Sequence, residues 1–206
     1  MQLTKNGVKP LVIVRVCYSL ITAQNSYIVS FSVFQKVNIL SIINIIPMTS
    51  AHLSQVKDIY NHYIKHTHIN FETNPYNDDY MLEWFEQFDH SGRYHAYVAV
   101  ENEQVFGFAL SQKFRPKPAY STSIEVTFYL TEAAAGKGLG KKLGHHLLGN
   151  LKHQDINRAY AAIALPNAAS VGLHKSLGFI EAALLSQVGR KFDKFYDVAY
   201  LEYQFS

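Results

Sequence analysis

The sequence predicts a single mixed α/β domain, and three of its features support this prediction. Segments that alternate apolar and polar residues, as strands do, are interleaved with segments whose apolar residues recur at helical spacing. Residues 124–151 have the pattern of a strand, a glycine-containing turn and a helix, in that order. The 206 residues are 48% hydrophobic and 17% charged, which is typical of a soluble globular domain long enough to bury a core.

The first expected element is a short apolar strand at 42–47. Thr49 or Ser50 can cap the helix that follows, because a side-chain oxygen there accepts a free N–H group of the first turn. Residues 70–75 break the helical pattern, and a second helix is expected at 80–88. The apolar residues at helical spacing are Leu53, Val56, Ile59, Tyr60 and Tyr63 in the first helix, and Met81, Trp84, Phe85 and Phe88 in the second.

Three antiparallel strands are expected next. Residues 94–100 and 105–112 alternate as strands on either side of a four-residue polar turn, which indicates a hairpin. A basic loop stiffened by two prolines, residues 115–118, then leads to a third strand at 123–130.

The segment after that strand has the composition of a phosphate-binding turn. Glycines occupy positions 136, 138 and 140, and leucines at 139, 143, 147, 148 and 151 form one side of the following helix. The N–H groups at a helix N-terminus have no helical partner and the helix dipole adds positive charge, so an anion is favoured there. Glycines also mark ordinary turns, and Gly144 and Gly149 each cost this helix about 1 kcal/mol relative to alanine. Both readings of the turn remain open on this pattern alone.

The remaining elements complete the mixed order. A strand is expected at 158–165, a helix at 168–177 that Gly178 ends, and two strands at 179–188 and 195–205. One strand, two helices, three strands, a helix, a strand, a helix and two strands therefore follow one another, as in a mixed α/β domain.

Residues 1–40 are expected to form an apolar N-terminal extension of unknown role, outside a domain that spans 41–206. Two β-prone runs lie at 11–16 and 26–34. Arg15 interrupts the first run and no small-residue cleavage site follows it, so neither a signal peptide nor a membrane span fits. We expect an extra strand or two, or a poorly ordered extension, and no membrane association.

Charge and residue counts argue against several functions. The net charge is only +3 and no basic run is present, so we expect no nucleic-acid partner. Cys17 is the only cysteine, which rules out a disulfide framework and fits a reducing cytoplasm. His62 and His66 are four residues apart, but no Asp, Glu or Cys ligand set accompanies them, so we expect no metal.

Five blocks of sequence resemble a known family. They are residues 61–73 (NHYIKHTHINFET), 119–130 (AYSTSIEVTFYL), 136–140 (GKGLG), 165–179 (LPNAASVGLHKSLGF) and 196–205 (YDVAYLEYQF). In this order they resemble the GCN5-related N-acetyltransferase (GNAT) superfamily, and within it the phosphinothricin and methionine sulfoximine acetyltransferases. The resemblance implies a GNAT fold, a mostly antiparallel central sheet flanked by helices, with an acetyl-CoA site at a splayed strand pair. It also implies acetyl transfer to the amino group of a small amino acid, and a homodimer.

The resemblance assigns the acetyl-CoA contacts mainly to two backbone segments. In the strand, the amides of Phe128, Tyr129 and Leu130 would pair with the pantetheine arm, and one of them would polarise the thioester oxygen. The pyrophosphate loop consists of Gly136, Lys137, Gly138, Leu139, Gly140 and Lys141. Asn167 and Ser170 match further contacts, with turn and helix-capping roles as the alternative.

The glycine loop departs from the family pattern at two positions. Ala135 stands where the family carries glutamine or arginine, and Gly136 stands where these relatives usually carry arginine. The backbone donors do not depend on side chains, and Lys137, Lys141 and Lys142 still supply positive charge. We therefore expect weakened rather than abolished acetyl-CoA binding.

Two residues are the catalytic candidates. Glu125 lies in an otherwise apolar strand and matches the family's catalytic glutamate, which would act as a general base on the amine. Burial would raise the pKa of its carboxyl toward the working range, whereas the alternative is an edge-strand carboxylate in solvent. His174 matches a histidine of this subgroup and would protonate the leaving thiolate or assist in deprotonating the amine. Its alternative is a core or interface histidine.

The candidates for binding the acceptor are Phe71, Arg115, Lys117 and Tyr120. A guanidinium on a proline-stiffened loop can bind a carboxylate or phosphinate in fork geometry, although surface charge is an equal alternative. Phe71 and Tyr129 can line an apolar side of the pocket or pack in the core.

Two functions from different classes follow. The first is an acetyl-CoA-dependent N-acetyltransferase that acts on a small amino acid by direct transfer, because no cysteine is expected near the site. The second is a weakly active or inactive CoA-binding or interaction module of the same fold, suggested by Ala135 and the apolar extension. The identity of the acceptor rests on a few pocket side chains and is not predicted.

Overall fold

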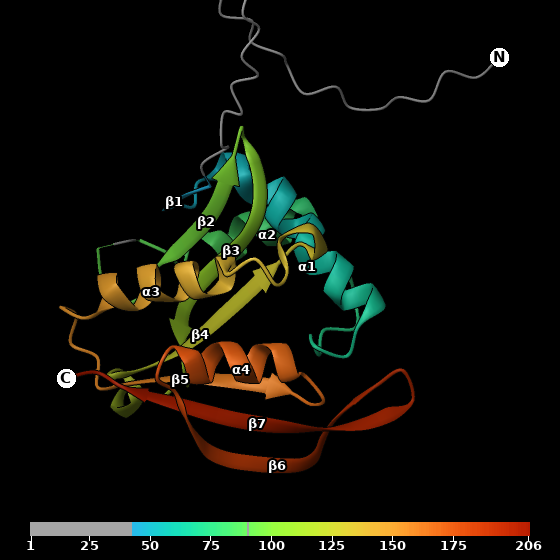
Figure 1. The fold of residues 1–206 in the computed structure, drawn as a ribbon, viewed down its shortest axis with the longest axis vertical. Coiled ribbons are helices and arrows are strands. Elements are labelled where there is room, and N and C mark those ends of the chain that lie inside the picture. Colours follow the sequence, from blue (N-terminus) through green and yellow to red (C-terminus); the bar gives the residue numbers. More distant parts are fainter. Residues whose placement is uncertain (1–42, 90) are drawn as a thin grey trace, which may run out of the picture. The chain divides into compact units, whose positions relative to one another are not determined.

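The computed structural model describes residues 43–89 and 91–206, and they form one seven-stranded sheet with helices on both faces (Figure 1). The strand order is β1-β2-β3-β4-β5-β7-β6, with antiparallel pairing everywhere except between β4 and β5. The predicted mixed, mostly antiparallel α/β fold is confirmed. The predicted N-terminal extension lies outside the described residues.

Every helix and strand expected between residues 41 and 206 is present. The strands are β1 (Asn44–Pro47), β2 (Ala96–Glu101), β3 (Gln104–Lys113), β4 (Ser123–Leu130), β5 (Arg158–Ala164), β6 (Ile180–Lys191) and β7 (Lys194–Gln204). The helices are α1 (Leu53–His66), α2 (Asp78–Phe85), α3 (Leu139–Leu151) and α4 (Ala168–Ser176).

The bounds of α2 differ from the expected 80–88 for local reasons. Asn77 caps the helix, because its side-chain oxygen accepts a hydrogen bond from the Tyr80 amide at 2.8 Å. At the other end, the amides of Glu86 and Phe88 bond three residues back rather than four, so the α-helix tightens into turns after Phe85.

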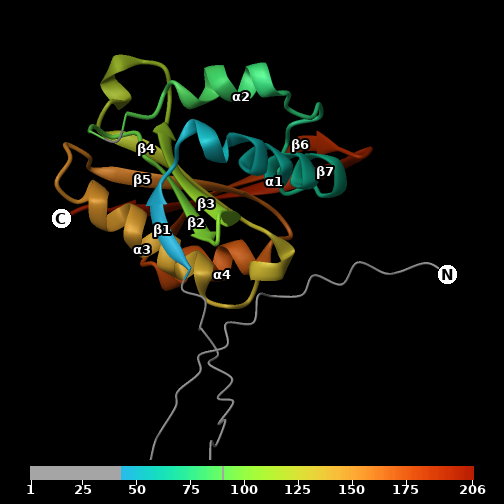
Figure 2. The ribbon, with the colours of Figure 1, turned by 90° about the horizontal axis from the view of Figure 1, so that it is seen from above.

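Two cores, one on each face of the sheet, explain why these helices form. Helices α1 and α2 cover one face, and α3 and α4 cover the other (Figure 2). Val56, Ile64 and Met81 pack with Phe108 of β3 on the first face. The leucines of α3 (Leu143, Leu147 and Leu151) are fully buried on the second face. Each such side chain contributes roughly 1.5–3 kcal/mol on burial, which outweighs the weak intrinsic helix propensity of these segments.

Gly144 lowers the helix propensity of α3, but it also has a packing role that its sequence pattern does not show. A Cβ atom at this position of α3 would lie 2.3 Å from a methyl carbon of Leu177. The glycine therefore lets α3 and the end of α4 approach closely. By contrast, a Cβ on Gly149 would meet no heavy atom within 4 Å.

Strands β4 and β5 separate after a short parallel contact. Only the first three residues of β4, Ser123 to Glu125, pair with β5, whereas β4 pairs with β3 from Ile124 to Leu130. Strand β5 continues to Ala164 but pairs there with β7. The sheet is thus open between the second half of β4 and β5, as the resemblance implied.

None of the helices in the described residues is both long and apolar enough to cross a lipid bilayer.

Candidate functional site

A cleft of about 960 Å³ occupies the opening between β4 and β5. Its walls come from α1, α2 and the loop between them, strands β4 and β5, the glycine turn before α3, and α4. Twelve of the predicted site residues line it: Phe71, Glu125, Phe128, Tyr129, Leu130, Gly136, Gly138, Gly140, Lys141, Asn167, Ser170 and His174. The fold therefore gathers residues that are up to a hundred positions apart.

The backbone of β4 presents alternate residues to this cleft. The Thr131 amide bonds to Phe106 on the β3 side at 2.9 Å, whereas the Thr122 carbonyl accepts a bond from Asn157 on the β5 side at 2.8 Å. Since successive residues of a strand direct their backbone groups to opposite neighbours, Phe128 and Leu130 direct theirs toward the cleft and Tyr129 toward β3. The Leu130 carbonyl accepts a hydrogen bond from the Tyr63 hydroxyl at 2.7 Å, which agrees with this alternation.

The glycine turn has a backbone that other residues rarely adopt. Gly136 and Gly138 have φ angles of 73° and 76°, in the left-handed region, and Gly138 is the N-cap of α3. Gly140 and Lys141 of the first helical turn also line the cleft. The turn therefore presents N–H groups and a lysine to the same space. The exposed Lys137 does not line the cleft, and the Leu139 side chain is buried in the core.

Glu125 is half-buried, and its carboxylate lies 4.0 Å from a guanidinium nitrogen of Arg115. Burial raises the pKa of this carboxyl above its ordinary value, and the positive charge of Arg115 partly opposes the rise. Alternation along β4 puts the Glu125 side chain on the same face as that of Tyr129, toward α1 and α2. The edge-strand alternative for Glu125 does not apply, since β4 is a central strand.

Removing the guanidinium of Arg115 should raise the pKa of Glu125 further. A base acts only when deprotonated, so the acid limb of the pH–rate profile for kcat/KM should move to higher pH in Arg115→Met. The measurement is the profile between pH 4.5 and 8 for the wild type, this variant and Arg93→Met. Arg93 pairs with Asp155 at 2.7 Å and does not line the cleft. An acid limb that stays in place in Arg115→Met would exclude Glu125 as the group that limits the rate at low pH.

His174 is 3% exposed, and its two ring nitrogens have different surroundings. Nδ1 lies 2.8 Å from the Ser170 carbonyl oxygen, and since a carbonyl can only accept, Nδ1 carries the proton of the neutral ring. Nε2 is buried and has no hydrogen-bond partner among the described residues. Burial lowers the pKa of this histidine, so the ring is neutral near pH 7 and Nε2 is a proton acceptor. This geometry favours assistance in deprotonation over protonation of a thiolate by a resident imidazolium.

Aromatic side chains surround the part of the cleft that Glu125 faces. Tyr60, Tyr76, Tyr80 and Trp84 come from α1, α2 and the loop between them. Tyr76 and Tyr80 stack with ring centroids 4.3 Å apart, and Tyr60 meets Trp84 edge-on at 5.7 Å. Periodicity identified Tyr60 and Trp84 only as members of the apolar sides of the two helices, because it does not separate a core face from a pocket wall. We call this part of the cleft the acceptor half.

Asn70 is a further cleft residue that the sequence analysis missed. It is 8% exposed, and its amide nitrogen donates to the Tyr129 hydroxyl at 3.0 Å. Asn70 stands in a segment that its sequence marks only as a helix break. Its burial, which would have distinguished it, is not visible in a single sequence. Tyr129 thereby combines two roles, with its backbone in the sheet and its hydroxyl in the acceptor half.

The predicted basic loop approaches the site only through Arg115, which is exposed and lies beside Glu125 without lining the cleft itself. One guanidinium nitrogen donates to the Phe114 carbonyl at 2.8 Å, and the other lies 3.2 Å from the Tyr200 hydroxyl. Lys117 and Tyr120 are exposed and do not line the cleft. The structure thus brings one of these three candidates next to Glu125.

Asn167 and Ser170 have the capping role and also line the cleft. The Asn167 side chain accepts a hydrogen bond from the Ser170 amide at 3.1 Å and so caps α4. Within residues 43–89 and 91–206, no group of three or more His, Cys, Asp or Glu side chains is arranged to hold a metal ion.

Comparisons with known proteins agree on the kind of protein that has this cleft. The model of the acetyltransferase (GNAT) family matches residues 56–179. A phosphinothricin N-acetyltransferase of Streptomyces coelicolor is 39% identical over 158 residues, which is 76% of this chain and 92% of that protein. An L-methionine sulfoximine/L-methionine sulfone acetyltransferase of Salmonella typhimurium is 33% identical over 75% of this chain and 90% of that protein.

Solved structures give the same result. A putative acetyltransferase of Salmonella typhimurium, solved with acetyl-CoA, superposes with a TM-score of 0.74 at 31% identity, covering 80% of this chain and 94% of that one. A phosphinothricin acetyltransferase of Sinorhizobium meliloti, also in complex with acetyl-CoA, superposes with a TM-score of 0.75 at 26% identity, covering 80% of this chain and 89% of that one.

Proposed function

The chain belongs to the acetyltransferase (GNAT) family, and we propose that it acetylates the amino group of a small amino acid by direct transfer in the β4–β5 cleft. The family establishes an N-acetyltransferase that uses acetyl-CoA. The observation that carries the proposal is the meeting of a half-buried glutamate, a buried neutral histidine and a glycine-lined helix N-terminus in one cleft.

The residues of the cleft fit acetyl-CoA, which supplies the acetyl group. The amides of Phe128 and Leu130, directed away from β3, are suited to pair with an extended amide-containing arm. The glycine turn and Lys141 at the start of α3 are suited to a pyrophosphate. Whether Ala135 and Gly136 weaken this binding stays a prediction. The positive φ of Gly136 disfavours the arginine that is usual there, so the turn depends on backbone donors.

Glu125 and His174 divide the proton transfers. Glu125 removes a proton from the ammonium group of the acceptor and leaves a nucleophilic amine. As the new C–N bond forms, that nitrogen must lose a second proton, and Nε2 of His174 has the free lone pair to take it. The protonated His174 then returns this proton to the sulfur as the C–S bond breaks. Desolvation in the cleft disfavours the charged imidazolium and so favours its rapid return to the neutral form.

The acceptor class rests on the named relatives and on the acceptor half. The two relatives act on phosphinothricin and on methionine sulfoximine or sulfone, as their names state. The aromatic wall suits a compact side chain, and Arg115 lies next to the base, where it can balance the carboxylate of an amino acid.

The test is acetylation by the full chain. We expect release of CoA thiol and a product 42 Da heavier with at least one of L-methionine sulfone, L-methionine sulfoximine, phosphinothricin or L-methionine. Calorimetric titration with acetyl-CoA separates the alternatives. Binding without acetylation of any of these amines would favour the non-catalytic CoA-binding module, and no binding at millimolar acetyl-CoA would contradict both.

We also propose a homodimer that uses the hairpin of β6 and β7. Apolar side chains are exposed along it, including Ile180 (64%), Leu184 (59%) and Phe195 (61%), and β6 is an edge strand of the sheet. Sedimentation at the mass of one chain would contradict this proposal. A cytoplasmic location, independence from metal ions, and the absence of nucleic-acid and membrane partners stay predictions.

A further inference from the structure

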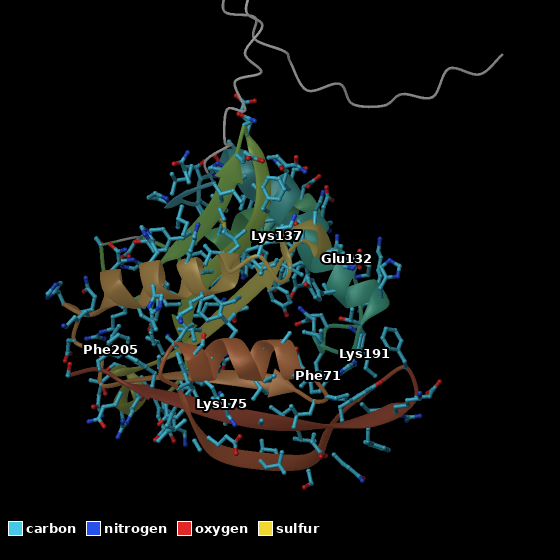
Figure 3. The ribbon with its side chains drawn as sticks, in the orientation of Figure 1. Phe71, Glu132, Lys137, Lys175, Lys191 and Phe205 are labelled. Carbon is cyan, nitrogen blue, oxygen red and sulfur yellow. The ribbon has the colours of Figure 1, made fainter. Side chains whose placement is uncertain are left out.

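The hairpin of β6 and β7 holds the loop that borders the acceptor half. This loop, residues 67–77, joins α1 to α2. His68 stacks on Tyr196 of β7 with ring centroids 4.5 Å apart and the rings 7° from parallel. Phe71 packs onto the backbone of Gly189, where a Cβ atom would lie 2.0 Å from the phenyl ring. Figure 3 shows Phe71 and Lys191 close together near the tip of the hairpin.

Lys191 makes the third contact between the hairpin and the loop, and it is unusual because it is a buried lysine. Its side-chain nitrogen donates to the Asn70 carbonyl oxygen at 2.6 Å. Lys191 is 5% exposed, and among the described residues it is the only lysine or arginine that is buried. Burying an ammonium group costs free energy unless it is well hydrogen-bonded, and burial here lowers the pKa of Lys191. An apolar residue would give the hairpin equivalent burial without this cost. A charge is favoured here by the Asn70 carbonyl and the nearby Glu72 of the loop, and by the Phe192 ring of the hairpin, whose centroid lies 5.2 Å from the ammonium nitrogen.

Asn70 passes the contact from the hairpin into the cleft. Its carbonyl accepts from Lys191, its side-chain oxygen accepts from the Glu72 amide at 2.7 Å, and its side-chain nitrogen donates to the Tyr129 hydroxyl at 3.0 Å. Tyr129, Asn70 and Glu72 all line the cleft, whereas Lys191 lies behind it. One chain of hydrogen bonds therefore runs from the hairpin tip through the loop to β4.

We propose that Lys191 is a positioning residue for the amino-acid acceptor: it fixes Asn70 and Phe71 so that the wall of the acceptor half is formed before the acceptor binds. The inference rests on the proposed function, because it needs the acceptor to bind in this half. A preformed wall lowers the entropy that the acceptor must lose on binding, so losing Lys191 weakens acceptor binding. The pantetheine and pyrophosphate segments, at β4 and the glycine turn, do not contact Lys191, so acetyl-CoA binding is spared.

The first test compares two lysines of the same hairpin. Lys191→Met keeps the aliphatic stem and removes the donor, whereas Lys194→Met changes the exposed residue paired with it in register. We expect the acceptor KM to rise about tenfold or more in Lys191→Met, as for a lost charged hydrogen bond. The Kd for acetyl-CoA should stay within about twofold, and Lys191→Arg should restore part of the loss. An unchanged acceptor KM, or an equal loss of acetyl-CoA affinity, would overturn the proposal.

A second variant keeps the proposal testable if Lys191→Met does not fold. Tyr129→Phe removes the hydroxyl at the other end of the same chain of hydrogen bonds and should raise the acceptor KM in the same direction. Where both variants fold, the double variant Lys191→Met/Tyr129→Phe should raise the acceptor KM by less than the product of the two single fold-changes, since both substitutions act through Asn70. A double variant whose fold-change equals that product, or an unchanged acceptor KM in Tyr129→Phe, would contradict a common action through Asn70.

Amide hydrogen exchange separates this inference from the proposed function. The Glu72 amide bonds to Asn70, so its exchange should accelerate in Lys191→Met and not in Lys194→Met. If the wild-type chain acetylates none of the amines tested, the proposed function fails, and the exchange rate still decides whether Lys191 orders the loop. Equal exchange in the wild type and Lys191→Met would overturn the positioning role.

Discussion

Replacing Glu125 by glutamine should lower kcat by about 10²- to 10⁴-fold, the range typical of losing a general base. The amide has nearly the shape of the carboxylate but cannot accept the ammonium proton. The Kd for acetyl-CoA should stay within about twofold, because the side chain points away from the α3 and α4 side of β4. Steady-state turnover and calorimetry measure the two effects separately.

The stability of Glu125→Gln distinguishes a catalytic loss from misfolding. The folded-state pKa of Glu125 is raised, so this group contributes stability below its unfolded pKa and loses it as pH rises through the folded value. At pH 7 the ionised carboxylate therefore destabilises the fold, and a neutral glutamine should leave the melting temperature unchanged or higher. Unchanged turnover would remove Glu125 from the mechanism, and lost turnover with a lowered melting temperature would leave its role unsupported.

Gly107→Ala should damage both stability and activity, because Gly107 pairs with Leu130 at the open end of β4. A Cβ atom there would lie 2.7 Å from the Tyr129 carbonyl oxygen and 3.2 Å from the Leu130 Cα atom, and backbone cannot move aside cheaply. We expect a loss of roughly 1–3 kcal/mol, with about 2–4 °C in melting temperature for each kcal/mol. A shift of β4 by about 1 Å would also lower the rate, by on the order of 10²-fold.

Gly149→Ala is the matched control for this prediction. Gly149 is exposed in the last turn of α3, and a Cβ there would meet no heavy atom within 4 Å. Alanine should therefore stabilise the helix by roughly 0.5–1 kcal/mol through lost backbone entropy of the unfolded chain. A Gly107→Ala variant that melts and turns over as the wild type does would show that β4 tolerates displacement at the cleft.

Local pattern was enough to predict the secondary structure and the glycine turn that borders the cleft. Helical and strand periodicity identified the α-helices and strands of residues 43–89 and 91–206, since most of them bury one face in a core, and the glycine turn marked the start of α3. The open pair of strands followed from the family resemblance and not from periodicity, because the apolar pattern of one strand does not show which other strand it pairs with.

The missed residues are those whose role comes from long-range contacts. Lys191 and Asn70 are separated by 121 positions, and nothing near either residue indicates that they meet. Tyr60 and Trp84 have the spacing of core residues, and only the geometry shows that they also face a cleft. Gly107 did carry a signal, because an isolated glycine inside a strand often marks a close backbone approach. Lys117 and Tyr120 were selected as acceptor-binding residues from the composition of their loop. Their exposure shows that this composition does not determine where the side chains of the loop point.

The proposed reaction is direct transfer between two substrates held together in the β4–β5 cleft. Initial velocities measured while acetyl-CoA and the accepted amino acid are both varied test it most directly. Direct transfer predicts double-reciprocal lines that intersect, since both substrates must be bound before product leaves. Parallel lines, together with a chain 42 Da heavier after incubation with acetyl-CoA alone, would show an acetylated enzyme and contradict the account.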